Sequence, residues 1–315
     1  MIRTPFSELL GLEYPIIQGG MAWIADASLA AAVANGGGLG LIAAMNADAE
    51  WLRREIRKAK QLTENPFGVN IMLMSPYADE VAKVVCEEGV KVVTTGAGDP
   101  AKYMEEWHKA GIKVLPVVAS TAMAKRAAKN GAAAIIAEGG ESGGHVGELT
   151  TMTLVPQVCD VVDIPVIAAG GIADGRGIAA AFMLGAAGVQ LGTRFLVAEE
   201  CNVHRVYKEK ILKAKDIDTI TTGKRLGHPV RSLKNQFARE FFKKEYDSSV
   251  TNEELEAFAS GALRLAAIEG DAERGCFLAG QIAALIKKEQ PASEIIQEIF
   301  AEAELVLKGA CKWVK

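Results

Sequence analysis

The residue best suited to chemistry is His145, which lies in the glycine-rich run Glu138-Gly-Gly-Glu-Ser-Gly-Gly-His145-Val-Gly-Glu148. Glycines stand on both sides of it, and no apolar neighbour would pack it into a core. Because a histidine titrates near neutral pH, His145 can donate or accept a proton there. We therefore predict a catalytic role for His145. Glu138 could orient a ring N–H or a hydroxyl of a ligand, or could only cap a turn.

The other three histidines carry no comparable signal. His108 falls on a predicted helix away from the predicted active face, so we expect it at the surface. His204 and His228 lie in a charged segment without metal-ligand spacing around them, and we expect structural roles or a place in a lid. The sequence predicts no metal site.

Two glycine loops follow short apolar runs and can bind an anion. Gly170-Gly171 follows 166–169, and Gly192-Thr193 follows 188–191. Backbone N–H groups approach an anion closely where side chains are absent, and Thr193 and Arg194 add a hydroxyl and a guanidinium. Such glycines can also serve only tight turns. Two loops at this separation favour a phosphate site.

The elements that would position these residues recur regularly along the chain. Strand patterns alternate with helical patterns, which implies parallel βαβ units. Eight such strands predict an α/β fold of the (β/α)8 (TIM) barrel type, with chemistry at the carboxyl ends of the strands. The predicted strands are 15–18, 38–42, 67–72, 90–95, 113–118, 133–137, 166–169 and 188–191. The predicted helices include 28–34, 49–62, 78–88, 100–110, 121–129, 153–161, 178–184 and 292–307.

The segment after Phe195 differs in character, since it is charged, with long helical pieces and little strand pattern. We therefore predict a TIM-barrel domain, the cofactor-binding part, from 1–199 and 275–315, interrupted by an inserted, mainly helical lid domain at 200–274. Residues 205–234 contain nine basic and three acidic side chains. This local excess could attract an anionic partner, although a charge run is more often a solvated helical face.

Composition limits the class of protein. The chain has 315 residues, 50% of them hydrophobic, and a formal net charge of -4. Without long basic runs, nucleic acid is not expected as a partner. No signal peptide and no membrane-spanning stretch is expected, which predicts a cytoplasmic protein. A homodimer is the common arrangement for such an enzyme.

The pattern of the rim points to flavin mononucleotide (FMN) as cofactor. Small residues and single amides dominate the predicted strand ends, which leaves room for a flat ring system. The run Gly36-Gly37-Gly38 precedes a strand and therefore lacks the context of a dinucleotide fingerprint. A nicotinamide cofactor, if used, is not held by a Rossmann unit.

Five runs together resemble the nitronate monooxygenase (2-nitropropane dioxygenase) superfamily of FMN barrels. They are Pro15-Ile-Ile-Gln-Gly-Gly-Met21, Asn70-Ile-Met-Leu, Gly-Gly-His145-Val-Gly, Ala-Ala-Gly-Gly-Ile172-Ala-Asp-Gly and Gln190-Leu-Gly-Thr-Arg-Phe195. Within it, Phe67-Gly-Val-Asn-Ile-Met-Leu, Val92-Val-Thr-Thr-Gly-Ala-Gly98, Leu149-Thr-Thr-Met-Thr-Leu154 and the lid run 207–219 resemble the flavin-dependent enoyl-[acyl-carrier-protein] reductases.

The resemblance implies a function and a set of site residues. It implies reduction of a trans-2-enoyl thioester on acyl carrier protein in bacterial fatty acid biosynthesis, with NADH or NADPH as hydride donor and His145 as the catalytic residue. The usual Glu-Ala-Gly-Gly-His of that family is here Glu141-Ser142-Gly-Gly-His145. By position it implies these flavin contacts: Gly20, Met21, Asn70, Glu138, Gly144, Gly171, Gln190, Gly192 and Thr193.

Two other functions stay open at the level of the sequence. A nitronate monooxygenase would share the barrel, the flavin and His145 but would oxidise alkyl nitronates with O2. A non-catalytic flavin or phosphate-binding module would leave His145 without a role. The basic lid, including Lys208 and Lys213, is expected to dock the acidic carrier protein or a nucleotide phosphate if the reductase prediction holds.

Overall fold

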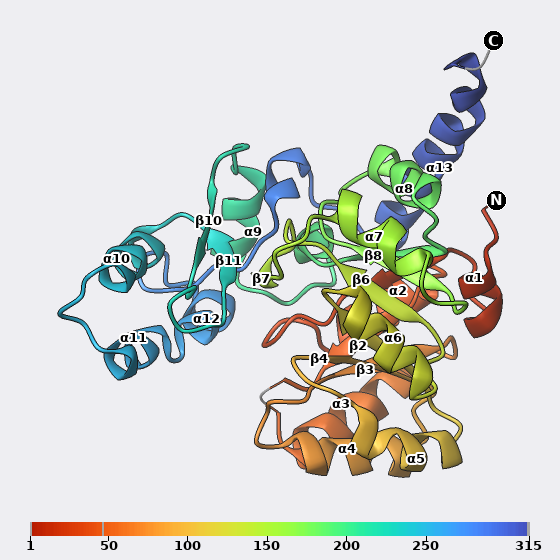
Figure 1. The fold of residues 1–315 in the computed structure, drawn as a ribbon, viewed down its shortest axis with the longest axis horizontal. Helices are drawn as coiled ribbons and strands as arrows, with labels where there is room; N and C mark the ends of the chain where they lie inside the picture. The colour runs from red at the N-terminus through yellow and green to blue at the C-terminus, as the bar shows by residue number, and fades with distance from the viewer. Residues whose placement is uncertain (1, 46, 314–315) are drawn as a thin grey trace.

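The computed structural model describes residues 2–45 and 47–313 and shows a barrel of eight parallel strands surrounded by helices (Figure 1). The strands are β1 (Ile16–Gln18), β2 (Gly40–Ala43), β3 (Phe67–Met72), β4 (Val92–Gly96), β5 (Lys113–Val118), β6 (Ile135–Glu138), β8 (Val166–Ala169) and β9 (Gly188–Leu191). Their order is β1-β9-β8-β6-β5-β4-β3-β2, and a parallel bridge from Ile17 to Leu39 joins the two ends. The predicted (β/α)8 barrel is confirmed.

Helices cover the outside of the barrel, at or near the predicted positions. They are α1 (Pro5–Leu10), α2 (Ala27–Asn35), α3 (Ala49–Leu62), α4 (Ala78–Glu87), α5 (Ala101–Lys109), α6 (Thr121–Lys129), α7 (Thr151–Cys159), α8 (Gly175–Met183) and α13 (Ala292–Gly309). Short helical turns η1 (Thr193–Val197), η3 (Gln281–Leu285) and η4 (Ala310–Trp313) join them. No helix in the described part of the chain is long and apolar enough to cross a membrane.

The barrel is a packed core at the end away from the candidate site. Phe6 of α1, Ile17 of β1 and Leu115 of β5 are fully buried in one cluster inside the strands. Close packing also explains a glycine of the second strand, because a Cβ at Gly40 would lie 2.0 Å from the carbonyl oxygen of Ala30 in α2. Only glycine lets this helix approach the strand so closely.

The segment between η1 and η3 stands out on one side of the barrel (Figure 1). Its elements are α9 (Arg205–Leu212), β10 (Thr219–Thr222), β11 (Val230–Leu233), α10 (Gln236–Glu245), α11 (Asn252–Ala259), α12 (Ala262–Arg264) and the π-helical turn η2 (Leu265–Glu269). Helices dominate it as predicted, but β10 and β11 form an antiparallel pair that the sequence analysis missed.

This pair joins the inserted segment to the histidine loop. The two-residue strand β7 (Gly144–His145) pairs with β11, in the order β10-β11-β7. The backbone of His145 therefore belongs to a sheet whose other two strands come from the inserted segment. The glycine-rich run is therefore held in a sheet at His145.

Candidate active site

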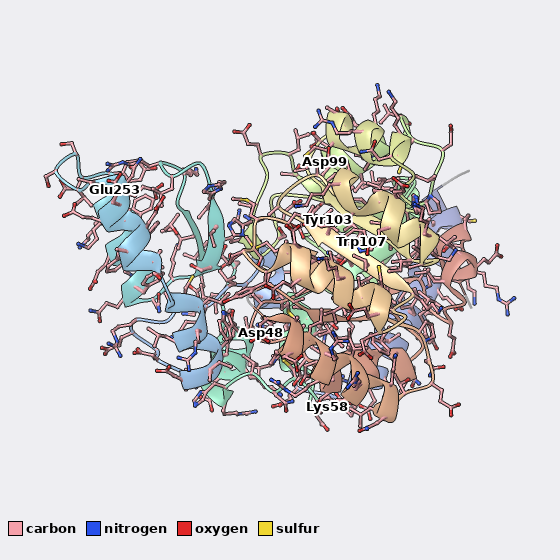
Figure 2. All side chains as sticks on the ribbon, turned by 90° about the horizontal axis from the view of Figure 1, so that it is seen from below. Asp48, Lys58, Asp99, Tyr103, Trp107 and Glu253 are labelled. Atoms are coloured by element: carbon pink, nitrogen blue, oxygen red, sulfur yellow. The ribbon has the colours of Figure 1, made fainter. Side chains whose placement is uncertain are left out.

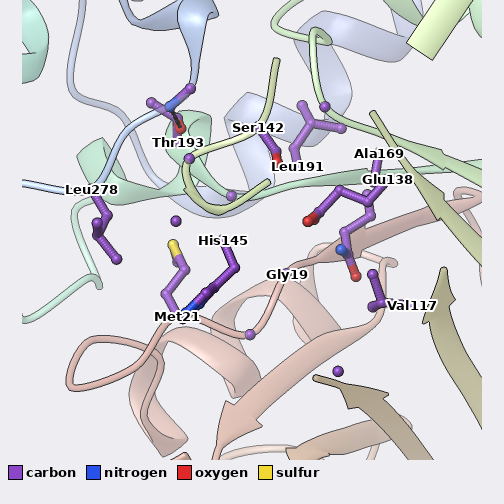
Figure 3. Close-up of a pocket in the computed structure, with 18 of the residues that line it drawn as sticks. Gly19, Met21, Val117, Glu138, Ser142, His145, Ala169, Leu191, Thr193 and Leu278 are labelled. Atoms are coloured by element: carbon purple, nitrogen blue, oxygen red, sulfur yellow. Dashed lines mark hydrogen bonds between the residues drawn. The ribbon is translucent and has the colours of Figure 1, made fainter. Parts of the chain in front are cut away.

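A cavity opens at the carboxyl ends of the barrel strands, where the sequence analysis placed the chemistry (Figure 3). Figure 3 shows the side chains of His145, Met21 and Glu138 around the same space. The structure brings together on this wall all the predicted site residues, namely Gly20, Met21, Asn70, Glu138, Gly144, His145, Gly171, Gln190, Gly192 and Thr193. Their roles toward a ligand stay predictions.

Asn70, on the third barrel strand, is fixed beside the loop that follows the first strand. Its Nδ2 atom donates to Oγ1 of Thr94 on β4 at 2.9 Å, which orients the amide. A Cβ at Gly20 would lie 2.3 Å from Cγ of Asn70, so the loop passes over this side chain only because residue 20 is glycine. The amide and the loop backbone can thus contact a ligand together.

The two glycine loops have the geometry of an anion site. Gly170 and Gly171 adopt positive φ values of 86° and 70°, which favour glycine. A Cβ at Gly170 would lie 2.7 Å from the carbonyl oxygen of Gly139. Oγ1 of Thr193 accepts a hydrogen bond from the backbone N–H of Gly280 at 2.9 Å, so its own proton can still be donated to a ligand.

Arg194 does not line this cavity, in contrast to the expectation that it would help to bind a phosphate. Its guanidinium is buried, and Nη2 donates to Oε1 of Gln290 at 2.6 Å. Burial lowers the pKa of this guanidinium from its usual range. The arginine therefore joins η1 to the segment before α13, which leaves backbone N–H groups and the hydroxyl of Thr193 as the groups that can bind an anion here.

Glu138 is the carboxylate whose environment is most altered. It ends β6 on the cavity wall, and burial raises the pKa of its carboxyl group to about 7. The nearby hydroxyl of Ser142 offsets part of this rise in pKa. The buried Oγ atom of Ser142 nevertheless has no hydrogen-bond partner among the described residues. Near neutral pH, Glu138 and Ser142 can therefore donate hydrogen bonds to a ligand and accept hydrogen bonds from it.

His145 presents an exposed ring at the cavity wall. Partial desolvation, with a smaller contribution from the charge of His228, lowers its pKa from the usual value of 6.5. The two ring centroids are 6.4 Å apart, with the rings nearly perpendicular. At pH 7 the imidazole is therefore mainly neutral and can donate a hydrogen bond from one nitrogen. His228, predicted to lie in the lid, approaches His145 from the turn between β10 and β11.

The loop that carries His145 is fixed at two further points. Glu141 accepts hydrogen bonds from the backbone N–H and the hydroxyl of Thr151 at the start of α7, at 2.9 and 3.0 Å. Arg231 of β11 donates from Nη2 to the carbonyl oxygen of Gly140 at 2.9 Å. The barrel and the inserted segment thus both determine where His145 lies.

Several residues of the cavity wall were missed by the sequence analysis. Tyr207 of α9, Leu263 of α12 and Leu278 after η2 add an apolar side to the cavity. The hydroxyl of Tyr207 donates to the carbonyl oxygen of Leu278 at 2.7 Å, which joins the inserted segment to the returning chain. Leu278 lies near Gly144, beside His145, and nothing in the local sequence indicates this position.

Some basic side chains of the inserted segment are bound within the protein, although six of the nine in 205–234 are exposed. Lys208 is 5% exposed, and its ammonium donates to the carbonyl oxygen of Ala198 and to Glu289, both at 2.7 Å. Arg225 donates to the carbonyl oxygen of Val250 at 2.6 Å, and Arg231 is half-buried. The expectation that Lys208 belongs to a docking surface is therefore wrong, whereas Lys213 is exposed.

No group of three histidine, cysteine, aspartate or glutamate side chains in the described ranges could hold a metal ion. His108 is exposed on α5, with Nε2 at 3.1 Å from the carbonyl oxygen of Gly131. His204 caps α9 through its ring nitrogen. These two histidines have the surface and structural roles expected of them.

Known proteins resemble the chain over nearly its whole length. The sequence model of the family described as nitronate monooxygenase matches residues 3–84 and 74–302. A "(3aS,4S,5R,7aS)-5-hydroxy-7a-methyl-1-oxo-octahydro-1H-indene-4-carboxyl-CoA dehydrogenase" of Mycobacterium tuberculosis is 33% identical, over 100% of this chain and 99% of that protein. A "probable nitronate monooxygenase" of Staphylococcus aureus is also 33% identical, over 97% and 99%.

The solved structure of FabK from Thermotoga maritima is more similar still. It has 50% sequence identity and a TM-score of 0.97, and the match covers 100% of both chains. The resemblance stated from the sequence is therefore confirmed in both its parts. The chain belongs to the nitronate monooxygenase family and is a FabK-like oxidoreductase within it.

Proposed function

We propose that the protein is an FMN-dependent enoyl-[acyl-carrier-protein] reductase that uses NADH or NADPH. The observation that carries this proposal is the 50% identity to FabK over the full length of both chains. The printed name of the M. tuberculosis relative also refers to a thioester, a CoA ester. This name supports a thioester substrate for the protein.

The cavity fits FMN. The phosphate would bind at the glycine loops after β8 and β9 with the hydroxyl of Thr193, and the amides of Asn70 and Gln190 would contact the ring system. The buried hydroxyl of Ser142, without a partner among the described residues, would gain one. When bound, FMN would carry a hydride from the nicotinamide to the β-carbon of the enoyl thioester.

His145 would act on the other end of the double bond. As hydride reaches the β-carbon, negative charge develops on the thioester oxygen and the α-carbon takes up a proton. A neutral imidazole can donate a hydrogen bond to that oxygen, whereas the proton for that carbon would come from the imidazolium form, which is then reprotonated from water. The lowered pKa of His145 agrees with a neutral donor at pH 7.

This role predicts the effect of removing the ring. General acid catalysis typically contributes about 10²- to 10⁴-fold, so His145→Ala should slow enoyl thioester turnover by about that factor. The purified variant should still contain flavin, because the glycine loops and Thr193 are unchanged. Near-normal turnover of His145→Ala would contradict the assignment.

The apolar side of the cavity would hold the acyl chain. Tyr207, Leu263 and Leu278 line the same cavity as His145, from the inserted segment and the returning chain. For carrier protein, Lys213 and Lys215 are exposed basic side chains of this segment. Lys213→Glu together with Lys215→Glu should raise KM for a carrier-bound enoyl thioester more than KM for its CoA analogue; equal effects would remove the docking idea.

A nitronate monooxygenase is the second candidate, because the matching family and the S. aureus relative bear that name. It would use the same cavity and His145 but would need no nicotinamide nucleotide. The apolar side of the cavity would then accommodate only a short alkyl nitronate. The two candidates differ in what reduces the flavin.

The deciding experiment follows the visible absorbance of the purified protein without oxygen. We expect a yellow protein that bleaches with NADH or NADPH and recovers its colour when a crotonyl thioester is added. A protein that stays yellow with both nucleotides but bleaches with an alkyl nitronate would be a nitronate monooxygenase. A flavin that no donor reduces would favour a binding module.

A further inference from the structure

A second cavity lies beside the flavin cavity, and we call it the tryptophan cavity. Its volume is about 470 Å³, within the range of about 300–1,000 Å³ common for small-molecule sites. Its wall includes Trp23, Trp51 and Arg54 from the barrel together with Asn202 and Ile268 from the inserted segment. Ile24 lines both cavities, so the two are neighbours on one rim.

We propose that the tryptophan cavity binds the adenosine part of the dinucleotide whose nicotinamide reacts in the flavin cavity. This inference rests on the proposed function. In a dinucleotide, two riboses and a diphosphate separate the nicotinamide from the adenine. The adenine must therefore bind outside the cavity in which the nicotinamide reacts, and the tryptophan cavity is the adjoining space.

Two tryptophans give this cavity flat surfaces for a base. Trp23 is 43% exposed, and Trp51 is half-buried at the start of α3. Nucleobases stack on aromatic side chains, and one such stack contributes about 1–3 kcal/mol. Trp23 therefore presents an exposed indole at this rim, on which a base can stack.

The backbone of Trp23 supports a built site. Its φ is 65°, and in the described ranges only Ala97, on the wall of the flavin cavity, is another non-glycine residue with positive φ. The backbone N–H groups of Ile24 and Ala25 both donate to the carbonyl oxygen of Met21, at 3.0 and 2.9 Å, which closes the turn. Such strain is kept where the surroundings impose it and is concentrated at functional sites.

Arg54 supplies a free cation. It lies one helical turn after Trp51 on the same face of α3, and it makes no hydrogen bond or ion pair with any described residue. By contrast, Arg53 and Arg57 of that helix both pair with Glu88. A guanidinium is well suited to a phosphate oxygen, so Arg54 would contact the diphosphate.

Three carboxylates on the wall limit how much negative charge the cavity accepts. Asp26, Asp48 and Glu55 each accept a backbone N–H, from Ser28, Trp51 and Ala27 at 3.0, 2.8 and 2.8 Å. Figure 2 shows Asp48 at the end of α3 toward the inserted segment. Free lone pairs of such carboxylates accept ribose hydroxyls, as acidic residues do in dinucleotide sites. The cavity thus suits a neutral base and ribose with one phosphate group at Arg54.

Coenzyme A carries the same adenosine diphosphate chemistry, so the experiment separates the two sources. Trp23→Gly removes one indole and suits the positive φ, and Arg54→Gln removes the cation. Lys58→Gln is the matched control, since it removes a charge from an exposed position of the same helix outside the cavity (Figure 2). The FMN-loaded proteins are titrated with ADP-ribose by calorimetry, and KM is measured for NADH, crotonyl-CoA and crotonyl pantetheine.

We expect Trp23→Gly to weaken ADP-ribose binding and raise KM for NADH by about 5- to 150-fold, the range set by one base stack. Arg54→Gln should change both by about 10- to 150-fold, the range for one hydrogen bond to a charged group. KM for both thioesters and the flavin content should stay unchanged, and Lys58→Gln should resemble the wild type. A rise confined to crotonyl-CoA would assign the cavity to coenzyme A and overturn the proposal. Unchanged ADP-ribose affinity, or no binding to the wild type, would overturn it too.

The failure of this inference can be told from that of the proposed function. If NADH bleaches the wild-type flavin and the crotonyl thioester restores its colour, the proposed function stands whatever the variants do. If neither NADH nor NADPH bleaches it, the proposed function fails, and a calorimetric signal for ADP-ribose that both variants lose would still identify an adenosine site.

Discussion

At the scale of single residues, Glu138 should determine how stability depends on pH. Its pKa is about 7 in the folded protein, above the usual 4.5, so the folded state binds this proton more tightly than the unfolded chain. The free energy of unfolding should therefore fall by about 2–3 kcal/mol between pH 5 and pH 8. Glu138→Gln should lose this part of the pH dependence.

The measurement is urea unfolding of the FMN-free protein and the variant at pH 5 and pH 8. Because the wild type carries the cost of ionising Glu138 only at the higher pH, the variant should gain stability relative to it there. The same difference between the two proteins at both pH values would contradict the raised pKa.

His228 should influence His145 by charge. Its positive form is one cause of the lowered pKa of His145, after desolvation. His228→Gln removes that charge, so the pKa of His145 should rise but remain below the usual value. Titration of the ring C–H signals by NMR would measure it, with His108→Gln as a control far from the cavity. An unchanged or lower pKa of His145 in the variant would contradict this effect of the His228 charge.

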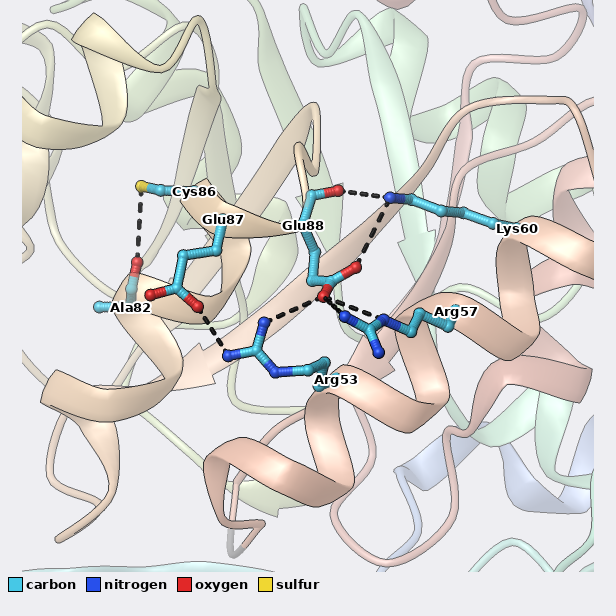
Figure 4. A network of polar contacts seen from close by, with 7 residues as sticks. All are labelled: Arg53, Arg57, Lys60, Ala82, Cys86, Glu87 and Glu88. Carbon is cyan, nitrogen blue, oxygen red and sulfur yellow. Dashed lines mark hydrogen bonds and ion pairs between the residues drawn. The ribbon is translucent and has the colours of Figure 1, made fainter.

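At the scale of elements, an ion-pair network joins α3 to the end of α4 (Figure 4). The carboxylate of Glu88, with 9% of its side chain exposed, accepts hydrogen bonds from Arg53 and Arg57 at 3.0 and 2.9 Å. These contacts lower the pKa of Glu88 against the opposing effect of burial. The network therefore contributes stability that is lost only when pH falls through this lowered pKa.

Glu88→Gln should lower the free energy of unfolding by about 1 kcal/mol at pH 7, because several charges share this carboxylate. Glu105→Gln is the control, since its pair with Lys109 is exposed and lies within one helix. Urea unfolding at pH 7 would compare them. Equal stability of the two variants would show that the network contributes no more than a surface pair.

The elements also show how far sequence alone can lead. The strands 67–72, 113–118, 166–169 and 188–191 were predicted at their observed bounds, because buried parallel strands are continuous apolar runs with local signals. The pair β10 and β11 was missed, since Thr-Ile-Thr-Thr and Val-Arg-Ser-Leu are short and polar and acquire their structure by pairing across the chain.

The site divides in the same way. The residues at the ends of barrel strands could be predicted because the fold brings strand ends together, and the resemblance supplied the remaining contacts. Tyr207 and Leu278 could not be placed, since long-range packing of the inserted segment brings them there. The burial of Lys208 was hidden for the same reason, because its partner Glu289 is 81 residues away.

At the scale of the whole molecule, the inserted segment has two parts. Tyr207 and Ile211 of α9 and Leu233 of β11 belong to the same apolar cluster as the barrel residues Val189 and Leu191. Phe237 and Phe241 of α10 instead pack with Leu255 of α11 in a separate small cluster. The predicted boundary at residue 200 therefore does not separate two hydrophobic cores.

This division predicts the order in which the molecule opens. Because a small satellite cluster is held by less buried apolar surface, α10 and α11 should open together at a lower free energy than the barrel. The amide hydrogens of α9 and β11 should exchange at the same free energy of opening as those of the barrel. His145 therefore keeps its partner strand β11 while α10 and α11 are open. Native-state hydrogen exchange in low urea would measure these groups. Exchange of α9 together with α10 would show that the whole segment opens as one lid and releases the strand that holds His145.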